Sequence, residues 1–80
     1  MDGLEHRDDE MAERHARGLY AAVRDGAIIA HLRLVPDALL DAVIDRVRAL
    51  AREDGVRLVV KRDTEDGRVR YRLRRRREGE

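Results

Sequence analysis

The chain has 80 residues and a net charge of +1, and it contains no cysteine, phenylalanine or tryptophan. A chain of this length forms one domain, and its composition excludes disulfides and cysteine-based metal sites as ways of reinforcing the core. No segment is long and apolar enough to cross a membrane, and the acidic start is unlike a signal peptide, so we expect a cytoplasmic protein with no membrane partner.

The small net charge conceals a division along the chain. Residues 1–45 hold five arginines and ten acidic residues, a net charge of −5, whereas residues 46–80 hold thirteen basic and seven acidic residues, a net charge of +6. Chains this short often gain stability by oligomerising, and oppositely charged halves can attract each other between copies. We therefore expect a homodimer.

The first half of the chain predicts one helix after a polar start. Residues 1–8 are polar and acidic, and we expect them to form a disordered N-terminus. From residue 9 to residue 24 apolar side chains recur at helical spacing, and Gly26 suits the left-handed position that ends a helix. Residues 9–75 are expected to form a single α+β domain, followed by a charged tail over residues 76–80.

The segment at residues 27–35 allows two interpretations. Its alternating apolar residues favour a short strand, and a helical turn and a half is the competing structure. Pro36 then opens a long central helix that reaches about Asp54 and carries one continuous apolar face. Aspartates near the start of this helix and arginines near its end complement the helix dipole, and Gly55 ends it.

Two strands with period-two alternation complete the domain, at residues 56–61 and 68–74. The residues between them predict an antiparallel β-hairpin, with Asp63 opposite Arg68. The inner face then pairs Val60 with Tyr71 and Leu58 with Leu73, and the outer face pairs Arg57 with Arg74 and Lys61 with Arg70. Like charges directly across two strands destabilise a sheet, so something should compensate them.

The basic hairpin is the main functional signal. Phosphate groups of a nucleic acid would neutralise it, and such binding weakens with salt because counterions are released. With no aromatic platform for stacking single-stranded bases, duplex DNA is the expected partner. The predicted nucleic-acid-binding residues are Arg57, Lys61, Arg68, Arg70, Arg72, Arg74, Arg75 and Arg76. Two alternatives remain: a solvated sheet face, or neutralisation by the acidic half within one chain or across a dimer.

Parts of the sequence resemble a winged-helix DNA-binding domain. Residues 34–39 look like the turn entering a recognition helix, and Gly55 followed by the hairpin that ends with residues 66–73 looks like the wing. The resemblance covers about residues 10–74 and implies DNA binding. Three aspartates at the leading end of the central helix would repel phosphate, so the resemblance implies binding mainly through the wing. They are Asp37, Asp41 and Asp45.

The stretch from Leu39 to Leu73 is also similar to the helix-plus-hairpin docking domains of modular peptide and polyketide synthases. Such domains bind a short partner segment by adding a strand to the hairpin edge. This resemblance implies a protein-interaction or docking function, with an acidic protein segment as the partner of the arginine-rich strand.

Residues suited to catalysis are scarce. The only histidines are His6, His15 and His31, and the chain contains neither serine nor cysteine. The spacing of these histidines does not match known metal sites. We therefore expect a non-catalytic binding module without a metal or cofactor.

Overall fold

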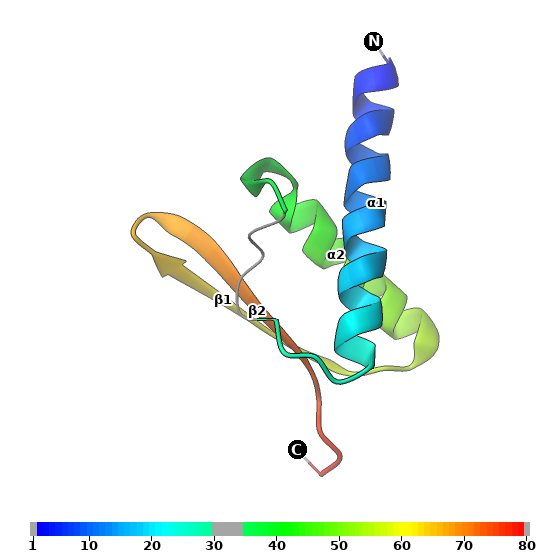
Figure 1. Ribbon diagram of the computed structural model, residues 1–80, viewed down its shortest axis with the longest axis vertical. Coiled ribbons are helices and arrows are strands. Elements are labelled where there is room, and N and C mark those ends of the chain that lie inside the picture. Colours follow the sequence, from blue (N-terminus) through cyan, green and yellow to red (C-terminus); the bar gives the residue numbers. More distant parts are fainter. Residues whose placement is uncertain (1, 30–34, 80) are drawn as a thin grey trace.

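The computed structural model describes residues 2–29 and 35–79 of the chain. It has an α+β fold, as the sequence predicts, with two helices and one antiparallel sheet of two strands. Figure 1 shows the helices crossing on one side, with the hairpin beside them. In chain order the elements are α1 (Asp2–Arg24), the 3₁₀ helix η1 (Asp37–Leu39), α2 (Leu40–Asp54), β1 (Leu58–Glu65) and β2 (Arg68–Arg75).

Helix α1 is longer than the sequence pattern predicts. It begins at Asp2, so residues 2–8 are helical rather than disordered. The sequence of this part is rich in acidic residues, and the positive end of the helix dipole favours carboxylates. The first turns of α1 extend well beyond the rest of the molecule (Figure 1). The sequence of residues 2–8 has no apolar residues recurring at helical spacing, which explains why the predicted helix starts only at residue 9.

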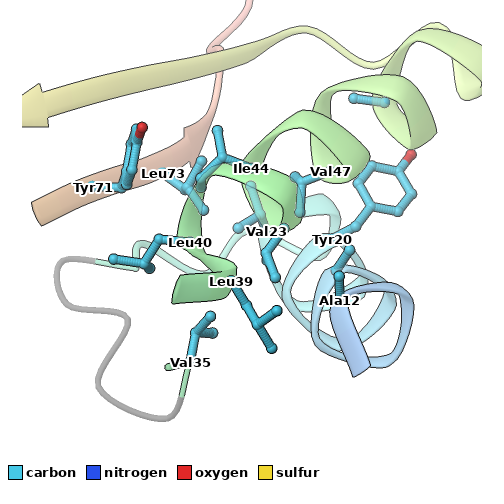
Figure 2. Close-up of a cluster of buried hydrophobic side chains, with 13 residues drawn as sticks. Ala12, Tyr20, Val23, Val35, Leu39, Leu40, Ile44, Val47, Tyr71 and Leu73 are labelled. Carbon is cyan, nitrogen blue, oxygen red and sulfur yellow. The ribbon is translucent and has the colours of Figure 1, made fainter. Parts of the chain in front are cut away.

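The core lies where α1 crosses α2 and where both helices meet β2. It is built almost entirely from small and branched aliphatic residues with two tyrosines, as Figure 2 shows. Small side chains on α1 let the two helix backbones approach closely. The buried residues are Ala12, Ala16, Tyr20, Val23, Val35, Leu39, Leu40, Val43, Ile44, Val47, Ala51, Tyr71 and Leu73.

An ion-pair cluster links the two helices at the rim of this core. Arg46 on α2 donates to Glu13 on α1 through Nε, and its Nη2 lies 3.1 Å from Glu13 Oε1. Arg17 Nε also donates to that oxygen, at 2.7 Å. Hydrogen bonds from Arg46 and Arg17 lower the pKa of Glu13 to about 2. This carboxylate therefore stays charged. Its ion pair with Arg46 links the two helices at one point along each.

Each tyrosine hydroxyl joins two elements of the fold. Tyr20 donates to Asp54 Oδ2 at 2.6 Å, which connects α1 to the end of α2. Tyr71 donates to Asp41 Oδ1 at 2.7 Å, which connects β2 to the start of α2. Burial and the bond to Asp54 raise the pKa of Tyr20, and the bond to Asp41 and burial raise that of Tyr71. Both contacts thus favour the neutral phenols.

Between the helices, the chain touches the sheet at Ile29. The Ile29 and Leu73 backbones exchange two hydrogen bonds, of 2.9 and 2.8 Å, in an antiparallel bridge. At this residue the extended alternative for residues 27–35 is therefore observed, and residues 30–34 lie outside the described part of the chain. The bridge places β2 between Ile29 and β1.

The central helix starts and stops close to the predicted positions. Pro36 has an extended backbone and leads into the turn of η1, so α2 proper starts at Leu40. Gly55 follows the last residue with a φ of 71°, and its N–H donates to the carbonyls of Ala51 and Arg52, the latter at 3.2 Å. Glycine is favoured there because other residues are strained in this left-handed conformation.

The hairpin has a different register from the predicted one. Glu65, not Asp63, lies opposite Arg68, so each pairing is shifted by two residues. The turn is the two-residue Asp66-Gly67, with φ of 53° and 75°, as a type I′ turn requires. Such a turn matches the right-handed twist of the strands, which is why it replaces the longer predicted loop. The inner-face pairs are Leu58 with Arg75, Val60 with Leu73, Arg62 with Tyr71, and Thr64 with Val69.

Candidate nucleic-acid interface

The face of the hairpin turned away from the core carries most of the predicted site. Because side chains alternate along a strand, the buried Tyr71 and Leu73 place their neighbours in sequence on this opposite face. We call it the outer face. Its cross-strand pairs are Val59 with Arg74, Lys61 with Arg72, Asp63 with Arg70, and Glu65 with Arg68.

The register changes how charge is distributed over the outer face. Near the turn, acidic and basic residues oppose each other, and Arg70 Nε lies 3.3 Å from Glu65 Oε2. Farther from the turn, Lys61 and Arg72 are opposed like charges, and Arg74 lies beyond them. The predicted pairs of Lys61 with Arg70 and Arg57 with Arg74 are therefore wrong. Basic residues therefore oppose each other at the base of the hairpin, whereas basic and acidic residues oppose each other at its tip.

Three other predicted residues lie outside the strand pairs of this face. Arg57 precedes β1, and its carbonyl accepts a hydrogen bond of 2.8 Å from the N–H of Arg76. The segments before β1 and after β2 therefore continue side by side. Arg75 lies opposite Leu58 in the inner-face row. Its Nη1 donates to the carbonyl of Arg24 at 3.1 Å, at the C-terminal end of α1. Arg75 therefore links the hairpin to the end of α1.

One basic residue of the hairpin was not among the predicted site residues. Arg62 lies opposite Tyr71 in the inner-face row, and its side chain lowers the pKa of that tyrosine against the larger effect of Asp41. Period-two alternation places residue 62 with Leu58 and Val60, so the pattern itself marked it as an inward charge. It lies at the margin of the core and is exposed.

The aspartates at the leading end of the central helix are all exposed. Asp41 accepts a hydrogen bond from the Tyr71 hydroxyl, so its carboxylate connects α2 to β2. Asp37 helps line a hollow of about 320 Å³ with Arg68 and Arg70 of β2. Acidic groups therefore lie beside the half of the hairpin nearest the turn, which we call the tip half. The half farthest from the turn, which we call the base half, is the more electropositive part.

Two further hollows lie near the base. A groove of about 610 Å³ runs between α2 and β1, and we call it the α2–β1 groove. It is lined by Arg48, Ala51, Arg52, Val56, Arg57, Leu58, Val60 and Arg76. An open depression of about 770 Å³ lies at the ends of both helices, and we call it the basal depression. It is lined by Gly26, Ile28, Gly55, Val56, Arg57, Arg74, Arg75, Arg76, Arg77, Glu78 and Gly79.

Within residues 2–29 and 35–79, no group of three or more metal-ligating side chains is placed to hold a metal ion. In the same part of the chain, neither helix has the length and apolar character needed to cross a membrane. Comparison of the chain with protein-family models, curated proteins and solved structures found no match. The winged-helix and docking-domain resemblances therefore rest on sequence motifs alone and stay predictions.

Proposed function

We propose that this protein is a non-catalytic module that binds duplex nucleic acid through the base half of its outer face. The observation that carries the proposal is the pairing of Lys61 with Arg72, next to Arg74, on a face that neither α1 nor α2 covers. This arrangement costs stability in the free protein, because like charges repel across strands. Phosphates would remove that cost on binding.

The spacing of the charges supports a phosphate backbone as the ligand. Arg72 and Arg74 are two residues apart on β2, so their Cα atoms are separated by about 6.7 Å. Successive phosphates of one DNA strand advance by about 3.4 Å along the helix axis and also wind around it, so two side chains at this spacing can reach neighbouring phosphates of one strand. Both tyrosines are buried, so neither ring is available for base stacking, and this supports phosphate contact as the mode of binding.

The test compares two variants that remove the same charge. Lys61→Gln/Arg72→Gln neutralises the facing pair, and Arg48→Gln/Arg52→Gln neutralises two exposed arginines on α2. Binding of random-sequence duplex DNA is measured by fluorescence anisotropy across a salt series. The outer-face variant is expected to bind more weakly, with a slope of log K against log salt that is shallower by about 1.8, since each phosphate contact contributes about 0.9. The α2 variant should keep the wild-type slope.

Equal losses in the two variants would show that net charge alone attracts DNA, and the outer face would then have no special role. Wild-type protein that does not bind at low salt would contradict the proposal directly. Circular dichroism of each variant checks the fold. The Lys61→Gln/Arg72→Gln variant should be at least as stable as wild type, because the cross-strand repulsion is gone.

A second candidate function is the docking of an acidic peptide, which the open edge of β1 favours. Among the described residues, β1 pairs only with β2, so its other edge offers unpaired backbone groups. The α2–β1 groove lies beside this strand, with Leu58 and Val60 along it and Arg48 and Arg52 at its α2 side. An extended segment with alternating acidic and apolar side chains would fit both features.

A synthetic peptide of alternating valine and glutamate tests this candidate. Backbone amide shifts in NMR spectra should concentrate in β1, and Arg48→Gln/Arg52→Gln should weaken binding by about tenfold. The Lys61→Gln/Arg72→Gln variant is the control, since it is expected to bind the peptide as wild type does and to bind DNA more weakly. Shifts spread over the outer face, or an unchanged affinity in the α2 variant, would reject strand addition at this edge.

A further inference from the structure

The basal depression combines strong positive charge with exposed apolar surface. Five arginines and one glutamate line it, together with Ile28 and Val56. Ile28 is 61 % exposed, the most exposed of the large hydrophobic residues in the described chain. Exposure of an aliphatic side chain of this size to water is unfavourable, so a partner that covers Ile28 gains binding free energy. A suitable occupant is therefore acidic and carries an apolar side chain.

The N-terminal part of α1 has this chemistry. Asp8, Asp9 and Glu10 are all exposed, and Met11 follows them with 44 % of its surface exposed. Asp8 and Met11 are three residues apart and therefore neighbours on one side of the helix. Met11 and Ile28 are the only exposed large hydrophobic residues in the described chain. One stands beside the acidic cluster and the other lies inside the basic depression.

These two surfaces cannot meet within one chain. Asp9 and Arg24 are fifteen residues apart on one continuous helix, which separates them by about 22 Å. The carbonyl of Arg24 is bonded to Arg75, which lines the basal depression. Figure 1 accordingly shows the start of α1 at one end of the molecule and the base of the hairpin near the other. The rigid helix that carries the acidic cluster holds it away from its own depression.

We propose that the basal depression binds the acidic N-terminal turns of α1 from a second copy of this chain. Asp8, Asp9 and Glu10 of one copy face the arginines of the other, and Met11 covers Ile28. In a two-fold dimer each copy provides one helix end and one depression, so two identical contacts form. The interface closes on itself and leaves the paired Lys61 and Arg72 of the outer face outside it, whereas Arg74 belongs to both surfaces.

Light scattering coupled to gel filtration, at low salt and without nucleic acid, tests this dimer. Wild-type protein should show twice the 9.3 kDa mass of the chain, and the dimer should dissociate as salt screens the contacts. Two variants reverse the charge on one side each. They are Asp8→Lys/Asp9→Lys on α1 and Arg57→Glu/Arg77→Glu in the depression. Each alone should be a monomer, because both of its contacts would join like charges.

Mixing the two charge-reversed variants should restore a dimer, since each contact then joins opposite charges again. This rescue distinguishes a direct contact from damage to the fold, and Ile28→Glu should weaken the wild-type dimer without changing circular dichroism. A monomeric wild type at low salt, dimers that persist in either single variant, a mixture that stays monomeric, or assembly beyond a dimer would overturn the proposal. DNA binding by the outer face stands or falls separately, in the salt series described above.

Discussion

Replacing Leu73 with alanine is expected to lower the free energy of unfolding by about 2–5 kcal/mol, the range for large-to-small changes in a closely packed core. Leu73 has no exposed surface and belongs to the buried cluster drawn in Figure 2. On β2 it lies between Ile29 and Val60. Its side chain fills the space where the sheet meets the helices. A domain of this size has a stability near the low end of about 5–15 kcal/mol, so this loss removes much of it.

Urea denaturation followed by far-UV circular dichroism measures the effect, and Leu58→Ala is the matched control. Leu58 is a leucine of the same hairpin, but it is only partly buried and lies at the open end of β1. Its truncation should cost less than half as much, because solvent or neighbouring side chains fill the space. Equal costs at the two positions would contradict a core centred on β2.

Replacing Ala16 with leucine is expected to destabilise the protein by about 1–3 kcal/mol, although leucine is the more hydrophobic residue. Ala16 is fully buried where α1 crosses α2, and Val43 and Val47 of α2 are also without exposed surface. A larger side chain would push the helices apart. The same displacement would stretch the contact between Glu13 and Arg46 at the rim of the crossing.

Ala42→Leu makes the same change at an exposed position of α2 and should alter stability by less than about 0.5 kcal/mol. Thermal denaturation of both variants gives the comparison. A crystal structure of Ala16→Leu should show a wider separation between the helix axes. If Ala16→Leu were as stable as wild type, the helices would have room between them that their burial does not indicate.

The hairpin shows how far sequence reasoning reaches. Alternation assigned Tyr71 and Leu73 to the inner face and Arg72 and Arg74 to the outer face, and a shift of two residues leaves those faces unchanged. Alternation could not reveal the correct pairing, because turns of two and of four residues place the same side chains on each face. The dipeptide Asp66-Gly67 was the signal for the shorter turn, since both residues must adopt positive φ there.

Charge contacts were harder to anticipate than faces. The acids that oppose Arg68 and Arg70 were assigned to the turn, so the tip of the hairpin seemed more basic than it is. The role of Arg75 depends on a carbonyl 51 residues earlier in the chain, which no local pattern marks. Tertiary pairings of this kind follow from how elements pack, and periodicity describes each element by itself.

Strand β2 lies between Ile29 and β1, yet it follows both of them in the chain. Until residues 68–75 have been synthesised, Ile29 and β1 have no β2 to pair with. The carbonyl of Arg24 likewise lacks its hydrogen bond from the Arg75 guanidinium. The two helices can associate earlier, because their contact is complete without the hairpin. Without β2 the pair of helices would keep an uncovered apolar side, so this eight-residue strand closes the core.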